Sequence, residues 1–431
     1  MSREFKDSGI EWIGQIPKEW NLKRFQSQVI EIKEKNSPIK TNFILSLTIN
    51  DGVIPYEEKG NVGNISKDNH DEYKLAYPNT IVLNSMNILI GAVGICNYYG
   101  CVSPVYYVFK NVDSSDLRFL NYILSSPPFQ KYLRKFANGI LEIRLRISSS
   151  DILKQSIPIP PLSEQQKIAD YLDKVCGEAD EMITLQEKMI EELKAYKQSV
   201  ITETVTKGLN PNVPMKDSGI DWIGEIPEHW GTPSISYLTS ISSGSTPDRN
   251  NPLYWYDGTI NWIKTGELQN NVICSSEEKV TDDALRETSI KLYPKNTILM
   301  AMYGQGKTRG MTALLGVPCT TNQACAALII RNSSVTVKYL WKCLMAAYDA
   351  IRDKAVGTGQ PNLNIELISK FIIPLPPVNE QNAIVERIDK VVPSIESLIA
   401  VKQQKIEELK EYKKSVIYEY VTGKKEIQYG D

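Results

Sequence analysis

Residues 157–175 read IPIPPLSEQQKIADYLDKV, and residues 373–391 read IPLPPVNEQNAIVERIDKV. The two stretches lie 216 positions apart (373 − 157 = 216), and in both a proline-rich run leads into an amphipathic pattern. Each proline fixes φ and disfavours helix in the residue before it, so both runs are expected to be extended. The chain therefore contains two copies of an extended segment followed by a helix.

Two further pairs of segments extend this repeat to most of the chain. FKDSGIEWIGQIPKEW (5–20) corresponds to MKDSGIDWIGEIPEHW (215–230), and EELKAYKQSVITETVT (191–206) corresponds to EELKEYKKSVIYEYVT (407–422). The long middles between these segments diverge almost completely. Because neutral drift would blur both copies evenly, fixed ends with free middles indicate a shared framework that carries two different working surfaces.

Long helices are expected after the proline runs. Ser163 and Asn379 are candidate N-caps, and Glu164 and Glu380 suit the positive end of each helix dipole. A heptad-like pattern follows, with Gln186 and Lys402 as polar breaks in the same slot. Its apolar positions in the first copy are Ile168, Leu172, Val175, Ala179, Met182, Met189, Leu193, Tyr196 and Val200, and in the second Ile384, Ile388, Val391, Ile395, Leu398, Leu409, Tyr412 and Val416.

Gly177 and Pro393 occupy equivalent positions in these helices (393 − 177 = 216). Both residues are poor in helix interiors, so a kink or a break is predicted there in both. A helix over residues 178–206 would be about 44 Å long at 1.5 Å per residue. Two matching helices in one chain favour an intramolecular antiparallel pair that acts as a spacer. An ordinary dimerising coiled coil is the alternative.

The predicted fold class is α+β, with two α/β heads separated by two long antiparallel coiled-coil helices in a pseudo-two-fold internal repeat. The expected parts are head one (1–160), a first spacer helix (161–207), head two (208–376), a second spacer helix (377–423) and a C-terminal tail (424–431).

Short β-branched and apolar runs inside the heads predict strands and helices. The strands are expected at 79–86, 103–109, 296–304 and 324–330, and helices at 116–126 and 337–352.

Acidic residues are absent from two corresponding windows, 73–112 and 288–348, although the chain as a whole has a net charge of −2. Strands that face a phosphate backbone should avoid carboxylates, and buried core strands also lack them, so both interpretations stay open. Basic residues in the second window favour DNA: Lys291, Lys295, Lys307, Arg309, Arg331, Lys338 and Lys342.

Polar loops supply the candidate DNA-binding residues. Gln and Asn side chains suit bidentate contact with adenine, and Arg suits guanine or phosphate. For any single residue, an ordinary surface turn is the competing interpretation. The candidates are Arg144 and Arg146 in head one, and in head two Ser243, Thr246, Arg249, Lys264, Lys307, Arg309, Thr358, Gln360, Asn362 and Asn364.

Several other classes of function lack support in the sequence. The seven cysteines are scattered singly and only two histidines occur, so neither zinc nor a disulfide framework is expected, and a reducing cytoplasm fits best. No apolar run is long enough to span a membrane. AMYGQGKT (301–308) is close to a phosphate-binding loop, but no suitable helix follows it. No methyltransferase or nuclease motif is visible, so no catalytic site is expected in this chain.

The repeated motifs resemble those of the specificity subunits of type I restriction–modification systems. The resemblance rests on DSGIEWIGQIPKEW, IPIPPLSEQQKIADYLD and their second copies, and it covers nearly the whole chain. STPDRNNPLYWYDGTINWIKTGEL (245–268) and GTGQPNLN (357–364) are similar to the opening and the close of a target-recognition domain in that family. Head one departs from the family there, since NGILEIRLRIS (138–148) lacks the Gln–Asn pattern.

This resemblance implies that each head is a target-recognition domain that reads one half of a bipartite site in double-stranded DNA. It implies that the helices fix the spacer and dock two modification (methyltransferase) subunits, with restriction subunits as further partners. It places S-adenosylmethionine, ATP and Mg in those partners and none in this chain.

Two alternatives remain at this stage. One is the specificity subunit of a related system that cuts on both sides of a bipartite site. The other is a coiled-coil scaffold that joins two proteins without reading DNA.

Overall fold

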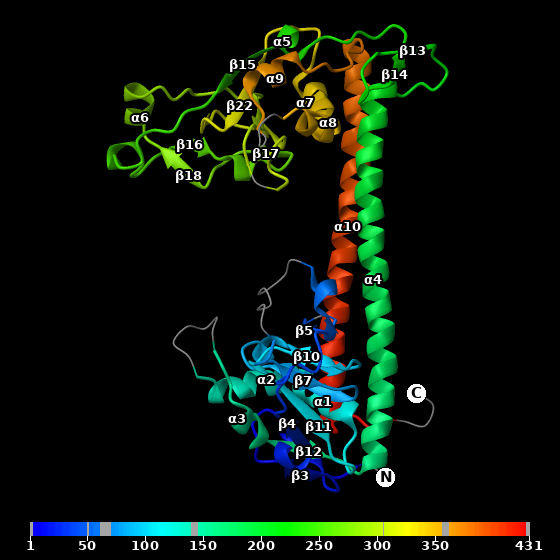
Figure 1. The fold of residues 1–431 in the computed structure, drawn as a ribbon. Helices are drawn as coiled ribbons and strands as arrows, with labels where there is room; N and C mark the ends of the chain where they lie inside the picture. Colours follow the sequence, from blue (N-terminus) through cyan, green and yellow to red (C-terminus); the bar gives the residue numbers. More distant parts are fainter. Residues whose placement is uncertain are drawn as a thin grey trace. The chain divides into compact units, whose positions relative to one another are not determined.

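The computed structural model describes residues 3–49, 51–60, 70–138, 145–304, 306–355 and 362–427. The chain forms two compact units, unit 1 (Met1–Glu187 with Gln403–Asp431) and unit 2 (Lys188–Lys402). Two long helices, α4 (Leu162–Lys207) and α10 (Val378–Val421), each contribute one part to unit 1 and one part to unit 2 (Figure 1).

Head one is built on a four-stranded antiparallel sheet in the order β4-β11-β8-β9. These strands are β4 (Val29–Ile32), β11 (Tyr106–Asn111), β8 (Thr80–Asn84) and β9 (Val93–Cys96). Helices α1 (Leu117–Ser125) and α2 (Pro127–Leu133) follow the sheet in the chain, and α1 packs against β8 and β9. Buried aromatic side chains such as Phe109 and Phe119 fill the space between the layers.

Head two repeats this arrangement and adds one strand. Its sheet has the order β15-β22-β19-β20-β17, in which β17 pairs in parallel with β20. The strands are β15 (Thr239–Ser243), β22 (Cys325–Ile330), β19 (Ile298–Ala301), β20 (Thr312–Leu315) and β17 (Asn271–Ile273), and the helices α7 (Val337–Ala346) and α8 (Tyr348–Asp353) follow them.

Smaller elements complete each head. Unit 1 has the hairpin β1 (Phe5–Asp7)–β2 (Gln15–Pro17), the pair β3 (Asn21–Arg24)–β12 (Ser156–Ile159), the hairpin β5 (Leu45–Leu47)–β6 (Val53–Pro55), the pair β7 (Lys74–Ala76)–β10 (Gly100–Val102) and helix α3 (Ser149–Leu153). Unit 2 has the hairpin β13 (Met215–Asp217)–β14 (Glu225–Pro227), the three-stranded sheet of β16 (Ile260–Ile263), β18 (Glu278–Val280) and β21 (Thr320–Thr321), and helices α5 (Ile235–Leu238), α6 (Asp282–Glu287) and α9 (Ile365–Lys370).

The predicted strands and short helices of the heads are confirmed. Each of the four strand segments contains a strand, namely β8, β11, β19 and β22. The segment 116–126 forms α1, whereas 337–352 forms two helices, because the chain leaves the helical conformation at Ala347 between α7 and α8.

The helix starts implied by the predicted N-caps are two residues late. Helices α4 and α10 begin at Leu162 and Val378, so Ser163 and Asn379 lie inside the first turn and are not N-caps. The carbonyls of the preceding prolines accept hydrogen bonds from Gln165 N and Gln381 N, at 3.0 Å in both helices. A proline carbonyl can begin the helix because only its N–H is missing.

Of the kink or break predicted at Gly177 and Pro393, the break is wrong and the kink stays a prediction. Both helices continue through these positions. Both residues are exposed, so the carbonyl that Pro393 leaves without its helical donor can be solvated by water. The cost of glycine, about 1 kcal/mol, is offset by the burial of its neighbours Cys176 and Ala179.

The predicted apolar seam is shifted by one position in the middle of both helices. Met182, Tyr196, Leu398 and Tyr412 are 45–56% exposed, whereas Ile190 and Ile406, which the predicted seam omits, are 6% and 7% exposed. Between Val392 and Val416, the buried and half-buried positions of α10 are Val392, Ile395, Ile399, Lys402, Ile406, Leu409, Lys413 and Val416, and the α4 equivalents 216 residues earlier are also buried or half-buried. This 3,4 spacing is a heptad repeat, so the coiled-coil interpretation holds in a different register.

The two helices run antiparallel within each unit. In unit 1, Tyr171 packs on Tyr420 with ring centroids 4.6 Å apart, and Asp180 pairs with Lys413. In unit 2, Lys197 pairs with Glu396 at 3.2 Å and Met189 contacts Lys402. Residue numbers rise along α4 as they fall along α10, which is the predicted antiparallel arrangement.

Candidate nucleic-acid interface

A buried glutamine ties each head to its long helix. Gln165 accepts a hydrogen bond from Asp116 N (2.9 Å) and donates one to Pro160 O (2.9 Å). Asp116 is the N-cap of α1, so this contact fixes the first turn of the helix that packs on the sheet. Gln165 is fully buried, and a buried amide with all its partners in place holds a geometry rigidly.

The same contact recurs in unit 2. Gln381, 216 positions after Gln165, accepts from Thr336 N (2.7 Å) and donates to Ser334 O (2.7 Å) and Pro376 O (2.9 Å). Thr336 is the N-cap of α7, the counterpart of α1. The framework therefore holds two unlike heads by an identical device.

A second repeated contact uses the glutamate before each glutamine. Glu164 accepts a hydrogen bond from the Trp20 indole at 3.1 Å, and Glu380 accepts one from the Trp230 indole at 3.0 Å. Both tryptophans are almost completely buried. The repeated GIxWIGxIPxxW motif thus folds against the start of the long helix in its own unit.

A third repeated contact joins the α1 or α7 helix to an aspartate of the long helix. In unit 1, Arg118 and Tyr122 both contact Asp173 at 2.7 Å. In unit 2, Lys342 contacts Asp389 at 2.8 Å, and Lys338 lies 3.9 Å from the same carboxylate. Two of the basic residues that favoured DNA in the acid-free window are therefore framework contacts.

The acid-free windows follow largely from burial. Strands β8, β19 and β20 have only buried residues, and β9 and β22 have mostly buried ones. A carboxylate in such a strand would be desolvated without a partner, which is costly whether or not DNA is near. The windows therefore do not by themselves locate a DNA surface.

Part of the predicted polar loops lies outside the described residues. Arg144, Thr358 and Gln360 belong to this group. Arg146 is exposed, and its backbone forms an antiparallel bridge with Asn138. Asn362 is half-buried, and Asn364 is the N-cap of α9, with its side chain accepting from Leu367 N at 2.8 Å.

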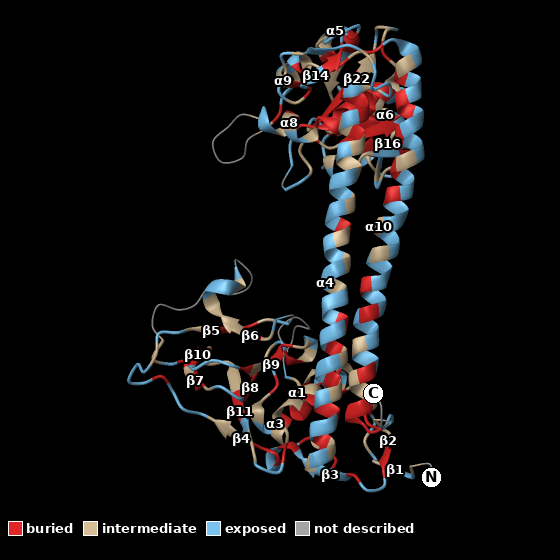
Figure 2. Cartoon of the chain, turned by 90° about the vertical axis from the view of Figure 1, so that its right-hand side faces the viewer, coloured by how far each residue is buried: buried red, intermediate tan, exposed pale blue. Residues whose placement is uncertain are grey.

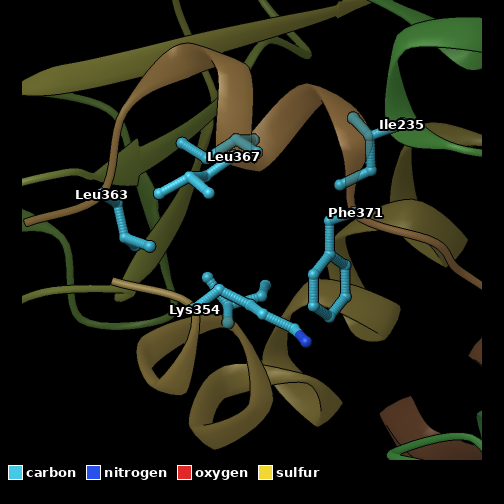
Figure 3. Close-up of a pocket in the computed structure, with 7 residues that line it drawn as sticks. Ile235, Lys354, Leu363, Leu367 and Phe371 are labelled. Atoms are coloured by element: carbon cyan, nitrogen blue, oxygen red, sulfur yellow. The ribbon is translucent and has the colours of Figure 1, made fainter. Parts of the chain in front are cut away.

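An apolar pocket lies beside the segment that carries Asn362 and Asn364 (Figure 3). The labelled side chains of Ile235, Leu363, Leu367 and Phe371 line it together with the stem of Lys354, and they leave no room for a water molecule. Such a lining offers almost no groups that could read a base edge, so we assign this pocket to packing.

Ser243 and Thr246 lie at the end of β15. The Ser243 carbonyl accepts a hydrogen bond from the Tyr293 hydroxyl at 2.9 Å. The Thr246 hydroxyl donates to Gln323 Oε1 at 2.5 Å. These contacts connect β15 to neighbouring segments of head two. They do not test whether Ser243 and Thr246 contact DNA, so that role stays a prediction.

Arg249 and Lys264 converge on one carboxylate. Arg249 forms an ion pair with Glu278, and Lys264 lies 3.0 Å from the same side chain. The Arg249 guanidinium also lies over the rings of Trp255 (3.9 Å) and Trp262 (4.5 Å). This arrangement gives Arg249 a structural role in the β16–β18 part of head two.

We therefore expect Arg249→Ala to lower the stability of head two by about 1–2 kcal/mol, through loss of two cation–π contacts and one ion pair. Urea unfolding of the full chain measures this effect, with the exposed Arg286→Ala as the control. An unchanged midpoint would contradict the structural assignment.

The same ion pair predicts a pH dependence. The hydrogen bond from Arg249, reinforced by Lys264, holds the pKa of the Glu278 carboxyl below its ordinary value. A carboxyl with a lowered folded-state pKa contributes stability above its unfolded pKa and loses it as the pH falls through the folded pKa. Stability should therefore fall more steeply on acidification, from about pH 5 downward, in the wild type than in Arg249→Ala.

Lys307 and Arg309 lie on a basic segment, Gly306–Gly310, that helix α8 holds by its backbone. Arg352 donates to Gly306 O and Arg309 O, both at 3.0 Å, and the Tyr348 hydroxyl donates to Lys307 O at 2.5 Å. Strand β20 follows at Thr312, so no helix stands where a nucleotide-binding loop would need one, as the sequence predicts.

The candidates thus fall into separate groups in head two. Arg249 and Lys264 share Glu278, Lys307 and Arg309 share the α8-held segment, and Ser243 and Thr246 lie at the end of β15. Sequence reasoning missed the framework residues Gln165, Gln381, Asp173 and Asp389. The available signal was their identity in both copies at an offset of 216.

Some chemistries find no support in the described part of the chain. Within the described ranges, no group of three or more His, Cys, Asp or Glu side chains is placed to hold a metal ion. Burial raises the pKa of the Cys325 and Cys343 thiols to about 12, which disfavours the thiolate form needed for ligation or attack. Among the described helices, none is both long and apolar enough to cross a bilayer.

Comparison with known proteins identifies one family. The family described as "Type I restriction modification DNA specificity domain" matches residues 17–195 and 227–411. The putative type I restriction enzyme MjaX specificity subunit of Methanocaldococcus jannaschii is 25% identical over 96% of this chain and 95% of its own length. The EcoR124I/EcoR124II specificity subunit of Escherichia coli is 27% identical over 64% of this chain, and the match spans only 63% of that subunit.

A solved structure supports the fold. A chain from a study of complex assembly and conformational transition of the type I R-M system superposes with a TM-score of 0.74. The match covers 94% of this chain and 98% of that one at 13% identity. The predicted α+β fold with two heads and long helices is confirmed by this likeness and by the two matched regions.

Proposed function

This chain belongs to the family of type I restriction–modification DNA specificity domains, and from that premise we propose that it is the DNA-reading subunit of a type I restriction–modification complex. Each head reads one half of a bipartite site in double-stranded DNA. The chain supplies recognition, and its partners supply the chemistry.

The observation that carries this proposal is the contrast between framework and heads. The two units share the order of four sheet strands and the same three contacts to the long helices, made by Glu164, Gln165 and Asp173 and by their equivalents 216 positions later. The remaining surface of each head differs in sequence. A protein that reads two different half-sites needs this combination, because phosphate contacts set register and base contacts set specificity.

We propose that the long helices act as the spacer between half-sites. Their continuity through Gly177 and Pro393 supports this role, since an unbroken helix is a stiffer spacer than a broken one.

We further propose that the helices dock two modification subunits. Much of the surface of α4 and α10 is exposed (Figure 2). Six exposed large apolar residues of these helices form three repeat-equivalent pairs: Met182 with Leu398, Leu185 with Val401 and Tyr196 with Tyr412. At 100° per residue, the three α4 positions lie within an arc of about 60°, and the three α10 positions do the same. Two equivalent apolar stripes suit two copies of one partner.

The cofactors belong with those partners in this proposal. S-adenosylmethionine would bind to the modification subunits, and ATP with Mg to restriction subunits where these join the complex.

Selection from random duplexes tests the proposed function. The full chain, purified together with its modification subunit, is expected to enrich a gapped motif of two short blocks separated by an unspecific spacer. Equal binding of all duplexes would instead indicate a scaffold that does not read DNA.

A head exchange provides a sharper prediction. Replacing residues 21–156 with the matching segment of another family member should change one block of the motif and leave the other block and the spacer unchanged, because the framework contacts of unit 2 are untouched. The reciprocal exchange of residues 231–372 is the matched control. A change in both blocks from either exchange would contradict the two-headed proposal.

A further inference from the structure

Each head has a cleft at the same place in its sheet. In head one the cleft lies beside the connection between β8 and β9, and in head two beside the connection between the equivalent strands β19 and β20. The two clefts have volumes of about 580 Å³ and about 500 Å³. Both are large enough to receive part of a nucleotide.

The walls of the two clefts correspond in topology. In head one, the connection residues Asn84, Met86 and Asn87 face the β5–β6 turn with Thr48 and Ile49. Strand β6 lies against β9 at the edge of this sheet.

In head two, the connection residues Lys307 and Thr308 face Gly266, Gln269 and Asn270. These last residues lead into β17, which pairs with β20 at the edge of its sheet. The clefts therefore share the strand connection and the edge-strand turn, and the cleft of head two is closed on a further side by Gln198 and Ile201 of α4 and Glu396 of α10.

Each cleft has one exposed amide side chain that makes at most one hydrogen bond within the described residues. The Asn87 side chain makes no hydrogen bond within the described residues, although its backbone is fixed by Asn84 O. Gln269 is also exposed, and its side chain has a single contact in the described part of head two, a donation to Gly266 O at 3.2 Å. The neighbouring amides Asn84 and Asn270 are instead used inside the protein, by Met86 N and by Thr312.

The charges of the two clefts differ. Head one brings Asp51, Glu58 and Lys59 to its cleft, whereas head two brings Lys307 and the ion pair between Lys197 and Glu396. Lys307 is exposed and forms no ion pair with any described residue, and the contacts from Tyr348 and Arg352 fix its backbone. A lysine whose backbone is already fixed loses less conformational entropy on binding a phosphate than a lysine on a flexible loop.

We propose that these two clefts are the base-reading sites of the heads, with Asn87 and Gln269 as the base-contacting residues and Lys307 as a phosphate contact beside Gln269. An amide presents a donor and an acceptor together, which matches the N6 and N7 edge of adenine. Arg352 and Tyr348 are positioning residues that hold Lys307 at the mouth of its cleft. This inference rests on the proposed DNA-reading function and assigns it to particular residues.

The experiment compares single variants of the full chain, each in complex with its modification subunit, by selection from random duplexes and by titration at several salt concentrations. The cleft variants are Asn87→Ala, Gln269→Ala and Lys307→Ala. The matched controls are Asn97→Ala, Asn250→Ala and Lys279→Ala, which replace an exposed amide or lysine side chain in the same head. Equal assembly with the modification subunit verifies the folding of every variant.

Asn87→Ala is expected to relax the preference for one base pair by about 5- to 150-fold, in one block of the motif only. Gln269→Ala should do the same in the other block. Lys307→Ala should weaken binding without changing the motif and should reduce the dependence of log affinity on log salt by about one unit. Arg352→Gln should reproduce the Lys307→Ala result, since it releases the backbone that Lys307 depends on.

Two failures can be told apart. A wild-type complex that selects no gapped motif would overturn the proposed function. A wild type that selects a motif, with Asn87→Ala and Gln269→Ala selecting the same motif at unchanged stringency, would overturn the cleft assignment alone.

Discussion

Replacing Gln381 with alanine is expected to lower the free energy of unfolding of unit 2 by about 3–5 kcal/mol. The Gln381 side chain is fully buried and contacts three backbone groups, Thr336 N, Ser334 O and Pro376 O, at 2.7–2.9 Å. Alanine leaves all three groups without this partner, and each unmet backbone group costs about 1–3 kcal/mol when it is buried, as Pro376 O is. The loss exceeds that of an ordinary surface contact because the Gln381 side chain itself is fully buried.

Hydrogen exchange of the full chain measures this effect with resolution between the units. Gln381→Ala should accelerate exchange in α7, and Gln165→Ala in α1, while the exposed Gln404→Ala should leave both unchanged. Gln381→Glu separates packing from hydrogen bonding. An ionised carboxylate accepts from Thr336 N but cannot donate to the two carbonyls, so this variant should become more stable as the pH falls and the acid is protonated. Wild-type protection in Gln381→Ala would contradict the framework assignment.

The repeat predicts the fold because both copies must satisfy one framework. Amino-acid composition does not indicate that Gln165 is important. Its recurrence as Gln381 does, because both side chains accept a hydrogen bond from the N-cap residue of the helix in their own head. The divergent middles predict separate heads for the same reason. Their strand order could not be predicted, because pairing between distant strands leaves no local pattern.

The seam of the long helices shows where periodicity misleads. Met182 and Ile183 are adjacent apolar residues, and a 4,3 pattern can be continued through either one. In the structure, the heptad positions that include Ile183 and Ile190 are half-buried or buried, whereas Met182 is 45% exposed. Burial by a partner and burial by the second helix use the same residue types, so sequence alone cannot separate an intramolecular seam from a docking stripe.

The candidate DNA residues show a second limit. Arginine is a residue type that often contacts DNA, but Arg249 packs against Trp255 and Trp262 and pairs with Glu278 in head two. These partners come from three different segments of the chain, so no local pattern announces them. Lys307 belongs to the same class of residue and has no such partners among the described residues, and this difference emerges only from the fold.

The exposed stripes of the long helices lead to the second large effect. Leu398 and Val401 belong to unit 2, and their equivalents Met182 and Leu185 belong to unit 1. Placing an aspartate in an apolar interface desolvates a charge without a partner, and two such changes should weaken docking by about 100-fold or more. Leu398→Asp with Val401→Asp should therefore remove one modification subunit from the complex and leave the other bound.

The stoichiometry of the complex is the decisive readout, because it separates two equivalent sites from a single extended one. Native mass spectrometry should give one specificity subunit with two modification subunits for the wild type, with one for either doubly substituted stripe, and with none when all four positions are changed. Thr184→Asp and Ala400→Asp are the matched controls, since both are exposed, repeat-equivalent and about 100° or more around the helix from the stripe. Loss of both partners from a single altered stripe would show that the partners hold each other on the helices. Retention of both after all four changes would mean that the stripes do not dock them.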